Sequence, residues 1–358
     1  MNNTYNNKRA IHRDRLFLAI LLALSLSMAA AQLPSEMREC AALQNDRERL
    51  SCYDSLAGRT APPPATGAEV MSPQVSETLT NEQNNRGGIK EKPPIYSRLG
   101  RHWELEQEEK RGLYNFRPHR ENYVIGTYNP SPHNEPYRPY QFLAPESSEL
   151  SRAELAFQLG FKLKAVENVA GTPMDVWFGY TQHSFWQVTN RDASSPFRET
   201  NYQPELMVVY PLNQEILGMR LRFLNAGLVH QSNGQGGTLS RSWNRVYLQA
   251  GLEGENFTLL PRIWHRISED ADEDDNPDIT HYLGHGDLMA TYYRDGHEMS
   301  VLARYNFGSG KGSARLGWAF PLTSKLKGYM QYFSGYGYSL IDYNDYQRVF
   351  GLGLQVSY

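Results

Sequence analysis

The sequence has few long apolar stretches. Its mean hydropathy is −0.60, and after the first 35 residues no apolar run is long enough for a membrane-spanning helix. This excludes a helical membrane protein. It does not exclude a membrane β-barrel, because the lipid-facing wall of a barrel uses only every second residue of a strand. The net charge is also small, at −3, which gives no general attraction to nucleic acid or to anionic lipid.

Cysteine is nearly absent, since Cys40 and Cys52 are the only two. They follow residues 1–31, in which basic residues precede an apolar run at 16–28 and three alanines come last. This pattern predicts a cleaved export signal, with an N-terminal anchor helix as the alternative. In an exported chain, two cysteines form a disulfide more often than a metal site. We therefore predict a Cys40–Cys52 disulfide in a small module of residues 32–58.

Residues 59–118 offer few apolar side chains to bury. They include three consecutive prolines at 62–64 and a stretch at 72–85 rich in Ser, Thr, Asn and Gln. Such a composition is typical of a flexible linker. The sequence leaves open whether residues 95–116 pack on the domain that follows or in its mouth.

From Tyr123 onwards, apolar and other side chains alternate. The clearest case is residues 155–163, where Leu or Phe alternates with Ala, Gln, Gly or Lys. Side chains two apart lie on the same side of a strand. Strands are expected near residues 122–129, 155–163, 174–188, 201–211, 219–232, 240–253, 255–267, 279–294, 297–307, 312–321, 325–334 and 346–358.

These twelve segments predict an all-β fold, with a twelve-stranded antiparallel transmembrane β-barrel over residues 119–358. About 9 to 11 residues are enough for a strand to cross a bilayer, and bacterial barrels have even strand numbers. A soluble β-sandwich or a lipocalin-like barrel would alternate in the same way, because the period alone does not say which face meets water.

Reactive side chains interrupt the apolar face of two neighbouring strands. His230 and Ser232 extend the apolar face of one strand, and Asn244 extends that of the next. In a hairpin with His230 opposite Asn244, a hydroxyl, an imidazole and an amide meet on one surface. A serine becomes a nucleophile when a base takes its proton and a third group holds the base. We predict these roles for Ser232, His230 and Asn244 respectively, with ordinary polar residues at a loop end as the alternative.

Residues 230–244, HQSNGQGGTLSRSWN, resemble the signature of the outer-membrane phospholipase A family. Two more stretches match in order: YTQHSFWQ at 180–187 with SSPFRETNY at 194–202, and DDNPDIT at 274–280. The resemblance covers roughly residues 120–358. It implies a twelve-stranded barrel in the bacterial outer membrane, hydrolysis of phospholipid acyl esters, dependence on calcium, and activity as a homodimer.

The resemblance also implies residues that bind calcium, about one ion per catalytic site. These are the Ser240 hydroxyl, the backbone carbonyl of Gln235, a carbonyl of Ser194 from a second subunit, and Asp275 in a related position used by the monomer. Gly237 stands where the family usually has an acidic residue, which removes one carboxylate from that monomer position. The N–H of Gly234 can approach the oxyanion, because glycine lets the backbone come close.

The resemblance gives Gln182 a hydrogen bond across the dimer, while a glutamine facing the lumen is the alternative. If the apolar wall faces lipid, the three reactive side chains lie outside the barrel near headgroup depth, where a phospholipid ester can reach them. The competing functions are a non-enzymatic outer-membrane barrel, either a porin or an adhesion platform, and a soluble periplasmic esterase. A non-enzymatic barrel would have no use for this cluster.

Overall fold

The computed structural model describes residues 40, 42–43, 45–56, 97–140, 149–191 and 196–357. The chain divides into two compact units, residues 1–88 and 89–358. The predicted export signal, most of the predicted linker and Ser194 lie outside the described residues. Within the described ranges, none of the helices has both the length and the hydropathy needed to cross a bilayer.

The first unit contains one described helix, α3 (Asp46–Leu56). A disulfide joins Cys40 to Cys52, with the two Cα atoms 5.6 Å apart, so the predicted pairing is present. The Arg49 guanidinium donates a hydrogen bond to the Leu43 carbonyl at 3.3 Å. In the chain-entropy model, a disulfide that closes so short a loop stabilises the folded state by about 3 kcal/mol.

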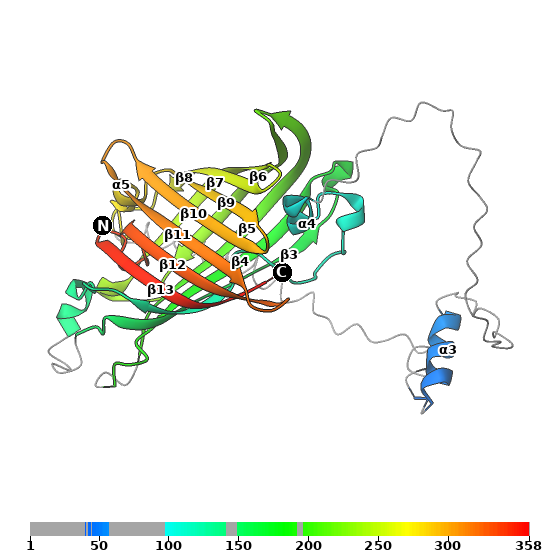
Figure 1. Ribbon diagram of the computed structural model, residues 1–358, viewed down its shortest axis with the longest axis horizontal. Coiled ribbons are helices and arrows are strands. Elements are labelled where there is room, and N and C mark those ends of the chain that lie inside the picture. Colours follow the sequence, from blue (N-terminus) through cyan, green and yellow to red (C-terminus); the bar gives the residue numbers. More distant parts are fainter. Residues whose placement is uncertain are drawn as a thin grey trace, which may run out of the picture. The chain divides into compact units, whose positions relative to one another are not determined.

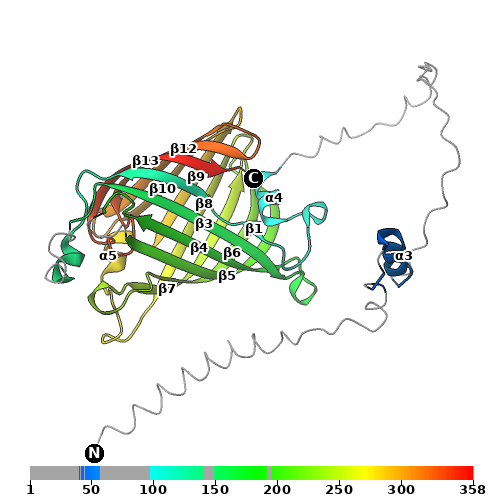
Figure 2. The ribbon, with the colours of Figure 1, turned by 90° about the horizontal axis from the view of Figure 1, so that it is seen from below.

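The second unit is a closed antiparallel barrel of twelve strands (Figure 1, Figure 2). The strands are β2 (Tyr123–Tyr128), β3 (Ala153–Val166), β4 (Asp175–Trp186), β5 (Phe197–Ile216), β6 (Met219–Ser232), β7 (Ser242–Glu253), β8 (Phe257–Ile267), β9 (Gly286–Arg294), β10 (His297–Asn306), β11 (Lys311–Pro321), β12 (Leu326–Tyr336) and β13 (Tyr346–Val356). Each strand pairs with its neighbours in sequence, and β13 pairs with β2 to close the ring. The short β1 (Arg117–Pro118) pairs with β3. The predicted twelve-stranded barrel is confirmed.

One predicted strand begins too early. Residues 279–283 of the segment expected at 279–294 form the helix α5 (Ile279–Leu283), and β9 starts at Gly286. Ile279 and Leu283 are four residues apart, which places them on one side of a helical turn, and both are buried. Gly284 ends the helix with a φ of 67°. The described part of the chain also contains the 3₁₀ helices η1 (Gln107–Glu109), η2 (Glu135–Tyr140), η4 (Val169–Gly171) and η5 (Gly237–Leu239).

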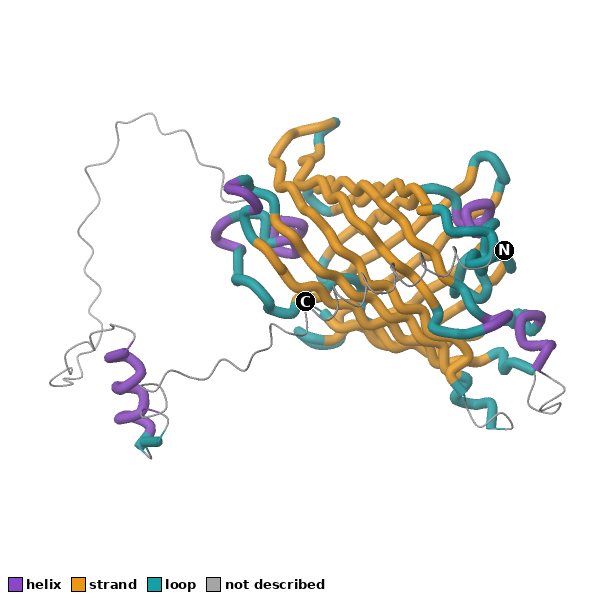
Figure 3. Tube along the Cα trace, turned by 180° about the vertical axis from the view of Figure 1, so that it is seen from behind, coloured by secondary structure: helices purple, strands orange, loops and turns teal. Residues whose placement is uncertain are grey.

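The barrel wall is apolar outside, and its interior combines polar and charged side chains with buried aromatic clusters. Along β13, Phe350, Leu352 and Leu354 are exposed on the outer face, whereas Gln347 and Gln355 are buried on the inner face. A cavity of about 770 Å³ lies in the lumen, and many polar and charged side chains line it. A soluble lipocalin-like barrel requires the opposite arrangement, so the alternation predicted from sequence belongs to a membrane barrel. Figure 3 shows the closed wall from behind.

The last part of the predicted linker packs in the mouth of the barrel. The helix α4 (Arg98–Trp103) lies at the end of the barrel opposite α5 (Figure 1). Ser97 caps it by accepting a 2.8 Å hydrogen bond from the Gly100 N–H, and the Ser97 hydroxyl donates to Glu253 at 2.6 Å. Trp103 is buried, and the Lys162 ammonium lies 3.3 Å from the centre of its ring. This answers the question that the sequence left open for residues 95–116, as far as they are described.

Candidate active site

The register of the β6–β7 hairpin agrees with the prediction. His230 lies opposite Asn244, and Ser232 lies opposite Ser242. The β6–β7 loop between them contains η5. The pairing follows from the apolar pattern, because a slip of one residue would turn every side chain to the other face of the wall.

His230 lies on the outer face of the barrel. It is exposed, as is Leu228 two residues before it, whereas Val229 is buried and Gln231 lines the lumen. Asn244 is opposite His230 on the next strand and therefore shares its face. These two polar side chains therefore lie on the apolar outer wall, the position expected for a wall that faces lipid.

His230 and Asn244 are hydrogen-bonded to each other. The distance between His230 Nδ1 and Asn244 Oδ1 is 2.8 Å, and Asn244 Nδ2 donates to Glu269 Oε1 at 2.8 Å. A carboxylate only accepts hydrogen bonds, so the Asn244 amide nitrogen must point to Glu269 and its oxygen to His230. His230 therefore carries its proton on Nδ1, and Nε2 is the nitrogen that can accept another.

Ser232 is two residues beyond His230 on the same face of β6. It pairs with Ser242 of β7 on one side and with Tyr202 of β5 on the other. Cβ atoms two residues apart along a strand are roughly 6 to 7 Å from each other, so the two side chains are neighbours on the outer face. The hydrogen bond that the structure gives His230 goes to Asn244 and not to Ser232. Catalytic hydrogen bonds often close fully only when substrate is bound.

Gly234 begins the turn after Ser232 and has a backbone that suits glycine. Its φ is +65°, in the left-handed region, and a Cβ there would come within 3.1 Å of the Tyr202 ring. A larger residue would therefore be strained and would also push on the tyrosine beside Ser232.

Sequence reasoning missed Asn233, which organises the β6–β7 loop. Its side chain is buried; Nδ2 donates to the Leu239 carbonyl at 2.8 Å, and Oδ1 accepts from the Arg241 N–H at 3.0 Å. Nδ2 also donates to Glu199 of β5 at 3.3 Å. An asparagine directly after the end of a strand was the available signal, because its amide can bond to the backbone nearby.

Two of the predicted calcium ligands meet, although they come from different loops. The Ser240 hydroxyl donates to Asp275 Oδ2 at 2.5 Å. Gln235 lies in the same loop as Ser240, and its N–H donates to Asn233 Oδ1 at 3.3 Å. No cluster of three or more His, Cys, Asp or Glu suited to a metal occurs in the part of the chain that the structure describes. A set made of a hydroxyl, a carbonyl and one carboxylate fits calcium, which prefers oxygen, better than it fits zinc.

Gln182 lies on the outer face of β4, not in the lumen. Thr181 and His183, on either side of it, line the cavity. Gln182 Oε1 accepts from the Tyr180 hydroxyl at 3.1 Å, and its Nε2 donates to the Ser184 hydroxyl at 3.0 Å. The alternative of a lumen-facing glutamine is therefore wrong, since neighbours along a strand alternate in direction.

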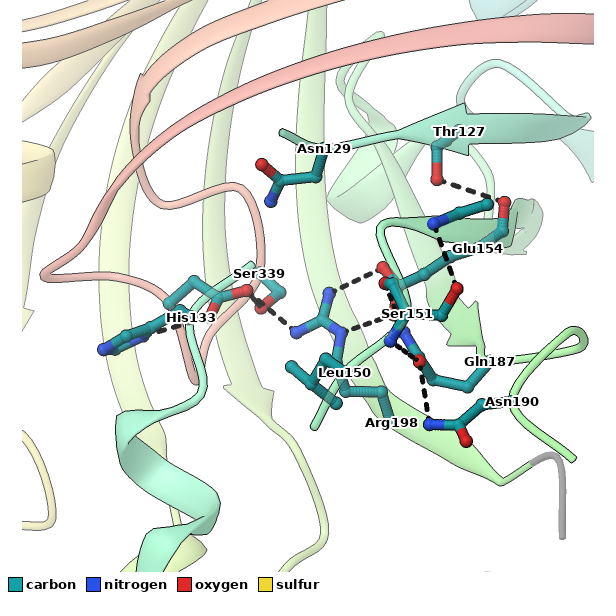
Figure 4. A network of polar contacts seen from close by, with 12 residues as sticks. Thr127, Asn129, His133, Leu150, Ser151, Glu154, Gln187, Asn190, Arg198 and Ser339 are labelled. Carbon is teal, nitrogen blue, oxygen red and sulfur yellow. Dashed lines mark hydrogen bonds and ion pairs between the residues drawn. The ribbon is translucent and has the colours of Figure 1, made fainter. Parts of the chain in front are cut away.

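Ion pairs join two strands, β3 and β5, to the loop after β12 at the same end of the barrel (Figure 4). Arg198 donates to Glu154 at 2.6 Å and to Asp342 at 2.9 Å, and all three are buried. His133 Nδ1 lies 3.2 Å from Asp342 Oδ1. Burial alone would raise the pKa of Asp342, but the charge of Arg198 and the bonds from His133 and Ser339 lower it to about 2.

This network reaches the candidate site through the neighbouring residue on β5. Glu199 accepts from Asn233 of the β6–β7 loop, and its other oxygen accepts from the Ile341 N–H at 3.1 Å. The loop after β12 is thereby connected to the turn that carries Gly234.

Comparison with known proteins identifies the family to which the fold belongs. The model of the family described as phospholipase A1 matches residues 99–356. A Neisseria meningitidis protein, provisionally named phospholipase A1, is 38% identical to this chain over 94% of each sequence. Phospholipase A1 of Escherichia coli K12 is 35% identical, over 67% of this chain and 81% of its own length.

Two solved structures have the same barrel. Outer membrane phospholipase A from Escherichia coli aligns with a TM-score of 0.64 and 34% identity, over 68% of this chain and 99% of its own. The Salmonella typhi outer membrane phospholipase, solved as a dimer with bound calcium, aligns with a TM-score of 0.64 and 34% identity, over 71% and 95%. The chain belongs to the phospholipase A1 family of outer-membrane acyl ester hydrolases.

Proposed function

We propose that the chain is a calcium-dependent outer-membrane phospholipase of A1/A2 and lysophospholipase type, with Ser232, His230 and Asn244 as its catalytic residues. The 2.8 Å bond between His230 and Asn244 on the lipid-facing wall carries this proposal. It supports a base with an oriented ring two residues from Ser232 on the same face, where a lipid would present its ester without leaving the membrane.

In the proposed reaction, Ser232 Oγ attacks the ester carbonyl while its proton passes to His230 Nε2. The ester C–O bond breaks, and His230 returns the proton to the departing glycerol oxygen. Water then attacks the acyl-Ser232 ester and gives a proton to His230. The bond between the acyl carbon and Ser232 Oγ breaks, the fatty acid leaves, and His230 returns the proton to Oγ. Asn244 stabilises the imidazolium by accepting the hydrogen bond from Nδ1, and the Gly234 N–H donates to the oxyanion.

The residues proposed to hold calcium in the dimer are Ser240, the carbonyl of Gln235 and a carbonyl of Ser194 of the partner subunit, whereas Asp275 belongs to a related position used by the monomer. Bound calcium would supply positive charge near the oxyanion. Gly237 provides no carboxylate, so Asp275, already in contact with Ser240, is the acidic ligand that remains. The calcium-bound dimer of the Salmonella typhi relative supports this proposal.

We further propose a homodimer in which Gln182 donates or accepts a hydrogen bond across the interface. Its position on the outer face, among other polar side chains, supports this role. Inside lipid, one such bond is worth about 0.6 to 2 kcal/mol. Covalently crosslinked dimers should therefore hydrolyse lipid faster than enforced monomers, and equal rates would refute the dimer proposal.

Residues 1–31 are proposed as the cleaved export signal, 32–58 as a disulfide-bonded module and 59–118 as a linker that ends in the barrel mouth. The enzyme would then act from the outer membrane on phospholipids of that membrane. We propose no nucleic-acid partner for this protein.

The deciding experiment is phospholipid hydrolysis by folded protein with and without calcium. Ser232→Ala should lower kcat by about a thousandfold or more, and a chelator should abolish wild-type activity reversibly. Ser242→Ala is the matched control, because this serine lies opposite Ser232, and it should stay within about threefold of wild type. Full activity of Ser232→Ala would instead favour a non-enzymatic barrel with a contaminating hydrolase.

A further inference from the structure

Glu269 lies next to the proposed catalytic cluster, just beyond the strand that pairs with β7. Ile267, the last residue of β8, lies opposite Asn244 on β7. Glu269 is two residues further along the chain. Its Oε1 accepts a 2.8 Å hydrogen bond from Asn244 Nδ2. The chain of contacts is thus His230, Asn244, Glu269.

The Asn244 amide needs a second partner that fixes its orientation, so that its oxygen and not its nitrogen points to His230. The two ends of its amide have nearly the same shape, and only the oxygen can accept the proton of His230 Nδ1. A flipped Asn244 would present an N–H to that N–H and release the ring. Because the Glu269 carboxylate accepts but does not donate, it selects the orientation that holds His230.

Glu269 also supplies a negative charge that Asn244 lacks. Its Oε2 is buried, has no hydrogen-bond partner among the residues that the structure describes, and lies 3.8 Å from Arg266 Nη2. The imidazolium formed during catalysis is positive, so a carboxylate one hydrogen bond away stabilises it. Ser-His-Asn sites contain no acid in direct contact with histidine. Here the carboxylate of Glu269 contacts Asn244, which in turn contacts His230.

The same arginine connects Glu269 to the loop that carries a proposed calcium ligand. Arg266 Nη2 lies 2.6 Å from Asp274, and Nη1 donates to the carbonyls of Asn276 and Pro277 at 3.1 Å each. These residues flank Asp275, which contacts Ser240. The positions of the base and of the metal loop are therefore set by one set of contacts.

We propose that Glu269 is a positioning residue for catalysis, which fixes the Asn244 amide so that its oxygen holds the His230 ring. The inference rests on the proposed function of Ser232 and His230. The charged and titratable groups around this chain of contacts are Glu269, Arg266, Asp274, Asp275 and, on the outer face of β8, His265.

The test compares Glu269→Ala and Glu269→Gln with wild type across pH, at saturating calcium, in detergent-solubilised full-length protein. Glu269→Ala should lower kcat by about 10- to 100-fold with KM within about threefold. Glu269→Gln retains an acceptor for Asn244 and should recover part of that loss. In both variants the acid limb of the kcat/KM profile should move to lower pH, because the stabilising charge is gone.

Three controls make the result decisive. Glu273→Gln changes an exposed carboxylate of the same loop and should match wild type, and thermal unfolding should show all variants folded. Asn244→Asp puts a carboxylate directly against His230 and facing Glu269. In that background Glu269→Gln should raise activity, since two carboxylates no longer face each other.

The proposal is overturned if folded Glu269→Ala keeps kcat within about twofold of wild type, if the acid limb does not move in either variant, or if Glu269→Gln lowers activity in the Asn244→Asp background. Ser232→Ala separates the two hypotheses. If Ser232→Ala remains active, the proposed function itself fails. If it is inactive while the Glu269 variants behave as wild type, only the inference on Glu269 fails.

Discussion

Asn233 shows how one buried amide sets the shape of the site. Its side chain bonds to four groups, from Glu199, Gln235, Leu239 and Arg241. A buried polar group that loses its partners costs about 1 to 3 kcal/mol. The loop that carries Gly234 and Ser240 therefore depends on a residue that takes no part in the chemistry.

Asn233→Ala should reduce both activity and stability, because the loop loses all four hydrogen bonds. We expect unfolding to become easier by about 2 kcal/mol and kcat to fall more than tenfold, as measured by chemical denaturation in micelles and by lipid hydrolysis. Asn344→Ala, at an exposed position in the loop after β12, is the control. Unchanged kcat in Asn233→Ala would show that the loop keeps its shape without this amide.

Part of the site was predictable from single residues. Alternation alone places His230, Ser232 and Asn244 on one face, because direction along a strand follows parity. Glu269 and Asn233 were not predictable in that way. Both lie just beyond the end of a strand, where side-chain direction depends on tertiary contacts and not on a period.

The helix α4 is an element that the sequence did not reveal. Its residues follow a stretch of linker composition, and six residues are too few to show a helical period. Trp103 is what holds it, since its ring lies 5.2 Å from that of Phe223 and meets Trp177 edge-on at 6.1 Å. The strands, in contrast, were predictable because each repeats its pattern over many residues.

Trp103→Ala should destabilise the barrel by about 3 to 5 kcal/mol, because it empties a large buried volume and leaves Lys162 without the ring that covers it. The midpoint of thermal unfolding measures this. Tyr114→Ala, at a 67% exposed residue of the same segment, should change it little. An unaltered midpoint for Trp103→Ala would mean that α4 contributes nothing to stability.

For the whole molecule, the polar lumen and the apolar outer wall together decide what the alternation means. The sequence shows the period but not which face meets water. The closed barrel shows which face is outside, and the exposed apolar side chains lie on that face. The ion pairs of Arg198 connect β3, β5 and the loop after β12, which are far apart in sequence, and no local pattern predicts them.

Acid should weaken this assembly below pH 4. The pKa of Asp342 is about 2 in the folded protein, below its ordinary 3.8, so its stabilisation is present above pH 3.8 and is lost as the pH falls toward 2. The loss amounts to about 2 kcal/mol. Unfolding of wild type should become easier over this range, whereas Asp342→Asn should show a smaller slope. Equal slopes would contradict the assignment.

The most direct measurement of the central claim is covalent labelling by a long-chain acylating inhibitor, followed by mass spectrometry of the peptides. We predict a single modified residue, Ser232, labelled in the presence of calcium and not after chelation or in His230→Ala. Labelling at another residue, or labelling of Ser232 that ignores both calcium and His230, would contradict the account.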